Sequence, residues 1–156
     1  MEQHRNKSVA GDPSTLAKLK DFNGIPICVR DLMTDKVVTL SPDSSLQEAI
    51  RMMANNSFRH FPVVDENGHL AGVVSDRDLL RAMNHSRDWN TTNIAEVMTQ
   101  NVVTVHSETP LTEVLEHILS LRINCLPVVD EKGKVFGIVT STDLLKAFQQ
   151  IQKHIE

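Results

Sequence analysis

The sequence predicts an α/β (α+β) fold made of two strand–helix–strand–strand–helix (βαββα) repeats packed with pseudo-twofold symmetry. The first indication is an internal duplication: residues 29–83 align on residues 94–148 without a gap, and 19 of the 55 aligned positions are identical. The second is that both copies alternate short β-branched runs with apolar residues at helical spacing. A unit of this length is short for an independent domain, so we expect the copies to bury their apolar faces against each other.

The first repeat opens with Val37–Leu40, a β-branched run that predicts a strand. A helix follows, and a capping-box pattern makes either Ser44 or Ser45 its N-cap. We expect this helix to end at Asn55–Ser57. The apolar positions that recur on one face of it are Leu46, Ala49, Ile50 and Met53.

A predicted hairpin and a second helix complete this repeat. Phe61–Val64 forms a strand, and its proline favours an edge position or a strand start. Asp65–Gly68 forms a turn whose glycine needs a positive φ. Leu70–Ser75 is almost wholly apolar, which predicts a strand buried on both faces. The second helix runs from Asp76 to about His85.

The second repeat keeps the same order of elements. We predict strands at Val102–Val105, Leu126–Val129 and Val135–Thr140, with a helix from Ser141 after the last of them. Another helix begins with Pro110 at its first helical position, where the missing N–H costs nothing. The apolar face of that helix consists of Leu111, Val114, Leu115 and Ile118.

The domain organisation follows from the duplication. Residues 1–24 are predicted to form an N-terminal tail, partly disordered, with the first repeat over 25–87 and the second over 88–156. Three strands and two helices cannot close a core alone, so we expect the halves to dock through their helices.

Composition and charge exclude several classes of function. A net charge of −4 gives no general attraction to nucleic acid or to anionic membranes. No run of residues is long and apolar enough for a membrane span or a signal peptide, which predicts a cytoplasmic protein. The two cysteines, Cys28 and Cys125, occupy unequal repeat positions and are predicted to be free thiols.

Four common catalytic and cofactor-binding motifs are absent, and the histidines do not cluster with cysteine or with one another. The chain lacks GxGxxG, GxxxxGK[ST], HExxH and GxSxG, and its seven histidines have no partner at metal-ligand spacing. Nothing in the residues argues for an enzyme, a metal site or a required cofactor.

The chemistry that remains lies at two equivalent strand–helix junctions. Ser75 precedes Asp78 by three residues, and Thr140 precedes Asp143 by the same spacing. One interpretation is a capping box, which needs no ligand. The other is that the helix N-terminus and hydroxyl hold a phosphate while the aspartate accepts hydrogen bonds from a ribose. The residues alone leave both interpretations open.

Three motifs that each occur twice resemble those of the cystathionine-β-synthase (CBS) domain. The first is the MTxxVVT motif that begins at Met33, and the second is the PVVDExG turn that begins at Pro62. The third is the segment from Gly72 to Leu80, which ends in Asp78-Leu79-Leu80. Each motif recurs 65 residues later. The resemblance covers about residues 25–150 and implies a tandem pair, called a Bateman module. It also implies two clefts that in many members bind adenine nucleotides or other adenosyl ligands.

The resemblance implies candidate ligand-binding residues for both clefts. One cleft pairs Thr34, Val38, Phe58, Arg59 and His60 with Thr140, Ser141, Thr142 and Asp143. The other pairs Ser75, Arg77 and Asp78 with Thr99, Val103, Ile123 and Asn124.

The two copies differ where phosphate contacts are expected. Arg59 and His60 in the first repeat correspond to Asn124 and Cys125 in the second, so the cleft completed by the basic pair should bind polyanions better. Asp76 stands beside the presumed phosphate position of the other cleft and disfavours binding there.

These features predict a non-catalytic, stand-alone regulatory module that binds AMP, ADP or ATP and forms a homodimer through exposed apolar faces of its second helices. One alternative is a structural or dimerisation module with empty clefts that holds an unidentified protein partner. Another is a sensor of a different small ligand, such as S-adenosylmethionine.

Overall fold

The structure, a computed structural model, describes residues 26–155, with the side chain of His154 excepted. The predicted N-terminal tail, residues 1–24, lies outside the described residues. The first repeat contains η1 (Val29–Asp31), α2 (Leu46–Asn56), β1 (His60–Val64), β2 (Leu70–Ser75) and α3 (Asp76–His85). The second contains η2 (Ile94–Glu96), α4 (Leu111–Leu121), β3 (Cys125–Val129), β4 (Val135–Thr140) and α5 (Ser141–Ile155).

Two antiparallel hairpins, β1–β2 and β3–β4, form the centre of the molecule, and their registers are related by the sequence repeat. Val63 lies opposite Gly72 in one hairpin, and Val128 lies opposite Gly137 in the other. The turn glycines Gly68 and Gly133 have φ of 83° and 78°, the positive values that the turns require. The mixed helix-and-strand fold with two equivalent repeats is therefore confirmed.

The predicted opening strand of each repeat is reduced to a single bridge. Leu40 forms one parallel bridge to Val63, and Val105 forms one to Val128. The residues before them are extended but form no ladder of hydrogen bonds, so the runs predicted as Val37–Leu40 and Val102–Val105 are not strands. Their β-branched side chains instead pack against the hydrophobic clusters.

The helix starts follow the capping rules with one shift. The Ser45 hydroxyl accepts the N–H of Glu48 at 3.1 Å, which identifies Ser45 rather than Ser44 as the N-cap of α2. Pro110 is the N-cap of α4 and not its first residue, because a bridge to Cys28 holds its backbone extended, with ψ of 144°. Leu115, predicted on the buried face of α4, is 45% exposed.

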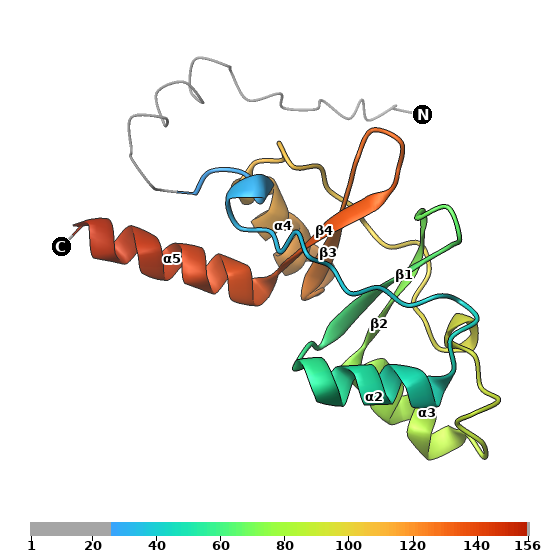
Figure 1. The fold of residues 1–156 in the computed structure, drawn as a ribbon. Coiled ribbons are helices and arrows are strands. Elements are labelled where there is room, and N and C mark those ends of the chain that lie inside the picture. Colours follow the sequence, from blue (N-terminus) through green and yellow to red (C-terminus); the bar gives the residue numbers. More distant parts are fainter. Residues whose placement is uncertain (1–25, 156) are drawn as a thin grey trace, which may run out of the picture.

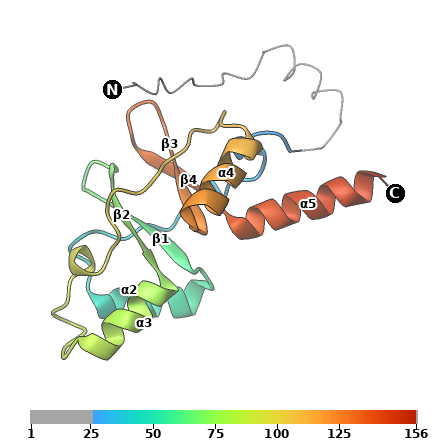
Figure 2. The same ribbon diagram turned by 180° about the vertical axis from the view of Figure 1, so that it is seen from behind.

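The two repeats meet through their hairpins, so the prediction that they dock through helices is wrong. Figures 1 and 2 show α2 and α3 beside β1–β2, and α4 and α5 beside β3–β4, with α5 projecting from the body. Val73, Cys125 and Ile138 form a buried cluster between the hairpins. The main helix packing among residues 26–155 stays within each repeat, α2 on α3 and α4 on α5, because each pair lies beside its own hairpin.

Each repeat contributes a segment to the core of the other. Val29 of η1 is fully buried in the core of the second repeat, and its N–H donates to the Thr109 carbonyl at 2.9 Å. Ile94 of η2 is fully buried in the core of the first, and its N–H donates to the Ser44 carbonyl at 2.8 Å. Each hydrophobic core is therefore completed by a residue from the other repeat.

The exchanged segments also clasp the opposite hairpin through close backbone contacts. Thr99 and Val73 exchange backbone hydrogen bonds of 2.9 and 3.0 Å, and Thr34 and Ile138 do the same at 2.9 and 3.0 Å. A Cβ atom on Gly72 would lie 2.7 Å from the carbonyl oxygen of Thr99. Glycine is thus required there for the segment to approach the strand.

No helix among residues 26–155 is long and apolar enough to span a bilayer.

Candidate functional site

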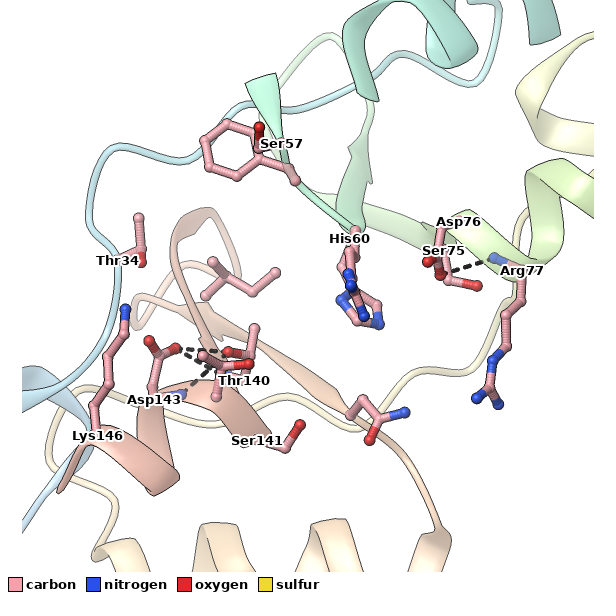
Figure 3. A pocket seen from close by; sticks show the side chains of 15 residues that line it. Thr34, Ser57, His60, Ser75, Asp76, Arg77, Thr140, Ser141, Asp143 and Lys146 are labelled. Atoms are coloured by element: carbon pink, nitrogen blue, oxygen red, sulfur yellow. Dashed lines mark hydrogen bonds between the residues drawn. The ribbon is translucent and has the colours of Figure 1, made fainter. Parts of the chain in front are cut away.

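A hollow of about 520 Å³ lies where the two strand–helix junctions face each other (Figure 3). It takes walls from both repeats because the hairpins pack side by side with their helices starting at the same end. The residues that line it are Thr34, Ser57, Phe58, Arg59, His60, Ser75, Asp76, Arg77, Asn124, Ile138, Thr140, Ser141, Thr142, Asp143 and Lys146.

Both junctions form capping boxes, as the sequence suggested. The Thr140 N–H and hydroxyl donate to Asp143 Oδ2 at 2.8 and 3.0 Å, and the Asp143 N–H donates to the Thr140 hydroxyl at 3.4 Å. Ser75 and Asp78 repeat this arrangement at 2.9, 2.8 and 3.2 Å. Among the described residues no donor bonds to Oδ1 of Asp143, although this side chain is buried. The cap therefore engages one carboxylate oxygen and leaves the other without a donor in this part of the chain.

The two helix N-termini differ in their free backbone donors. At α3 the Arg77 N–H donates to the side chain of Asp76 at 2.9 Å. At α5 the equivalent N–H, that of Thr142, has no acceptor among the described residues. Since a free N–H at a helix start attracts anions, α5 offers the better anion site.

Positively charged side chains surround the hollow. Arg59, Arg77 and Lys146 are exposed, and within residues 26–155 none of the three has a side-chain hydrogen bond or ion pair. An anion in the hollow would not have to displace an internal carboxylate from these groups.

His60 is half-buried and lies between the two junctions (Figure 3). Burial lowers the pKa of its imidazole, and Arg59 adds to the lowering, while the carboxylates of Asp76 and Asp78 oppose it. The free protein therefore favours the neutral ring at neutral pH.

The predicted residues of one cleft are largely brought together here. Thr34, Phe58, Arg59, His60 and the segment Thr140–Asp143 all line the hollow. Val38 does not, because it packs against the core of the first repeat.

Only three of the residues predicted for the other cleft line this hollow. Ser75, Arg77 and Asn124 line the same hollow, so residues assigned to two clefts share one space. Four predicted residues lie outside it: Thr99 pairs with Val73, Val103 and Ile123 pack on the second core, and Asp78 caps α3.

Four lining residues were not among the candidate ligand-binding residues: Ser57, Asp76, Ile138 and Lys146. Asp76 was expected there only as a charge that disfavours binding. Lys146 lies one helical turn after Asp143, so the i,i+3 spacing on α5 could have indicated it. Ser57 has a left-handed backbone, with φ of 57°, which turns the chain from α2 into the hollow. Ile138 is placed by its bridge to Thr34, which no local pattern reveals.

The cysteines are free, as predicted, and buried. Burial raises the pKa of Cys125 to about 12, so its thiol is protonated at neutral pH and is a poor nucleophile. Among the described residues no group of three His, Cys, Asp or Glu side chains is arranged to hold a metal ion.

The family model of the CBS domain matches residues 29–85 and 94–150, which is most of the chain. The chain belongs to the CBS domain family. It carries a tandem CBS pair, the arrangement of a regulatory ligand-binding module.

Solved CBS pairs have the same fold. The CBS domain pair of protein MJ0100, in complex with 5′-methylthioadenosine and S-adenosyl-L-methionine, has a TM-score of 0.73 and 34% identity, covering 80% of this chain and 98% of that one. CBSX2 in complex with AMP also has a TM-score of 0.73, with 30% identity and coverage of 81% and 99%.

Curated relatives include both short and long proteins. A CBS domain-containing protein of Dictyostelium discoideum is 33% identical, covering 76% of this chain and 89% of that protein. L-aspartate semialdehyde sulfurtransferase of Methanocaldococcus jannaschii is 33% identical, covering 77% of this chain and 23% of that protein. The chain thus spans about a quarter of the enzymes it matches.

Proposed function

We propose that this CBS pair binds an adenosine-containing ligand, AMP, ADP or ATP, in the hollow and acts as a regulatory module without chemistry of its own. The observation that carries the proposal is the junction at α5. There a buried carboxylate, a helix N–H and three cations border one space, and within residues 26–155 one carboxylate oxygen, the N–H and the cations have no partner.

The residues divide into sugar, phosphate and base contacts. Asp143 accepts hydrogen bonds from the ribose hydroxyls through Oδ1. The Thr142 N–H and the hydroxyls of Ser141 and Thr142 donate to the phosphate, and Arg59 supplies opposite charge. Thr34, Phe58 and Ile138 border the base; Phe58 is 39% exposed and rests edge-on against Phe61, with ring centroids 6.2 Å apart.

The two junctions should have unequal affinity. At α3 the carboxylate of Asp76 already accepts the N–H that a phosphate would need, and its charge repels the phosphate. We therefore expect one tight site, at α5, and a weak or empty one at α3.

The similar structures support an adenosyl ligand, but they do not indicate which adenosyl compound binds. MJ0100 takes an uncharged and a cationic adenosyl compound, whereas CBSX2 takes AMP. The unpaired cations of this hollow favour a phosphate-bearing ligand.

Isothermal titration calorimetry with AMP, ADP, ATP and S-adenosylmethionine tests the proposal. We expect wild-type protein to bind at least one nucleotide, and Asp143→Ala to weaken binding at least about tenfold, since one charge-assisted hydrogen bond is worth about 1.5–3 kcal/mol. Asp78→Ala is the matched control, because it removes the same cap from α3 and should leave the affinity nearly unchanged. Flat traces for all four compounds would contradict the proposal.

A second candidate function rests on the outer apolar face. Leu115 and Leu119 of α4 and Leu145 and Phe148 of α5 are 45–69% exposed, and their i,i+4 and i,i+3 spacings place each pair on one face of its helix. We propose that a homodimer forms through this face. A structural module that holds a protein partner with an empty hollow would use the same surface. A cytoplasmic location fits the free cysteines.

A further inference from the structure

We propose that His60 takes up a proton when a phosphate-bearing ligand enters the hollow, so that its imidazole selects phosphorylated adenosyl ligands over uncharged ones. This inference rests on the proposed function and assigns one residue a role in choosing the ligand.

The position of His60 carries the inference. It begins β1 and lies opposite Ser75, the N-cap of α3, in the hairpin register. Its ring stands between the α3 and α5 junctions in the hollow (Figure 3). No described residue forms a hydrogen bond with the ring, so its nitrogens are available to a ligand.

The charges that face His60 come from three elements. Arg59 precedes it, Asp76, Arg77 and Asp78 belong to α3, and Asp143 and Lys146 belong to α5. The carboxylates of Asp78 and Asp143 are engaged in helix caps, and that of Asp76 accepts the Arg77 N–H. These carboxylates do not offset the desolvation of the ring, since the pKa of His60 lies below its ordinary value.

A bound phosphate changes this balance. It places one or two negative charges in the space beside the ring and accepts a hydrogen bond from it, and both effects favour the imidazolium. An uncharged adenosyl ligand fills the space without adding charge, so it deepens the desolvation and keeps the ring neutral.

The corresponding position in the second repeat cannot act in this way. Cys125 lies opposite Thr140 as His60 lies opposite Ser75, but its thiol is buried and protonated at neutral pH. Proton uptake should therefore involve a single side chain.

The sign of the pH dependence follows from the two states. The pKa of His60 is lowered in the free protein, and we expect a bound phosphate to raise it. Affinity for the phosphate should therefore increase as the pH falls from the pKa of the complex to the pKa of the free protein. The change is about tenfold for each unit that separates the two values.

Calorimetry with AMP and with 5′-methylthioadenosine, in paired buffers of different ionisation enthalpy, measures the proton uptake. We expect wild-type protein to take up protons with AMP at about pH 7 and to bind AMP several-fold more tightly at about pH 6 than at about pH 8. With 5′-methylthioadenosine neither effect should appear. His60→Asn is the comparison variant, because titration of the AMP phosphate is common to both proteins and cancels in their difference.

The outcomes separate the two proposals. If AMP binds with the same proton uptake in wild type and His60→Asn, the role of His60 is overturned while the proposed function stands. If neither compound binds, the role of His60 is overturned, and the proposed function falls with it only if ADP, ATP and S-adenosylmethionine also give flat traces. Nitrogen-15 NMR of the imidazoles in wild-type protein needs no variant, and a His60 ring that stays neutral at pH 7 with AMP bound also overturns the inference.

Discussion

Single side chains distinguish two junctions that share the same backbone geometry. The caps at Ser75 and Thr140 have the same hydrogen bonds, yet Asp76 accepts the N–H of Arg77 at the start of α3. Its counterpart Ser141 accepts no N–H from Thr142, which has no acceptor within residues 26–155. Lys146 lines the hollow, whereas its counterpart Arg81 does not. The duplication thus preserves the fold, and substitutions at a few positions set the chemistry of each end of the hollow.

Lys146 should contribute to anion affinity through its charge. We expect Lys146→Ala to weaken AMP binding about three- to tenfold at low salt, and the loss to shrink as ionic strength screens the interaction. Arg81→Ala removes the same charge from the equivalent position outside the hollow and should have little effect. Equal losses in the two variants, measured by calorimetry at two salt concentrations, would show that Lys146 acts only through net charge.

At the scale of elements, local patterns predicted the hairpins and helices well. The bounds of β2 and α3 agree with the prediction because turn residues and capping boxes mark both ends. The opening strands were predicted wrongly, since β-branched residues favour extended backbone but do not supply a partner strand. The capping residues of the site were likewise predictable, whereas Ile138 and the sharing of one hollow depend on how segments from the two repeats cross.

Those crossings make one glycine more important than its twin. A Cβ on Gly72 would meet the backbone carbonyl of Thr99, whereas a Cβ on Gly137 would meet first the flexible Met33 side chain, at 2.8 Å. We expect Gly72→Ala to lower the free energy of unfolding by about 1–3 kcal/mol, because backbone cannot move aside as a side chain can. Gly137→Ala, the matched control, should cost less. Urea unfolding of both variants checks this order, which equal midpoints would contradict.

At the scale of the whole molecule, the exposed faces of α4 and α5 are the main feature that the described chain leaves uncovered. The corresponding helices of the first repeat expose only Leu80 among their large apolar side chains. A dimer that uses the α4–α5 face would join the second repeats and leave the hollow accessible, since α5 meets the hollow only with its first turns.

Charge placed on that face should separate the subunits. We expect Leu119→Glu combined with Phe148→Glu to convert a dimer into a monomer in native mass spectrometry, because burying two carboxylates per subunit costs several kcal/mol. Lys132→Glu, which adds negative charge on the β3–β4 turn, should leave the mass unchanged. A wild-type protein that is monomeric at micromolar concentration would refute the proposed dimer.

The exchange of η1 and η2 has a consequence for how the molecule fails. If the first repeat unfolds, Ile94 of the second repeat loses the core in which it is buried. If the second repeat unfolds, Val29 of the first repeat loses its buried position in the same way. Neither half can melt while the other stays intact, so the pair should unfold in a single cooperative step. Cleavage of the chain between residues 85 and 94 would give two fragments with incomplete cores. The first fragment would lack Ile94, and the second would lack Val29.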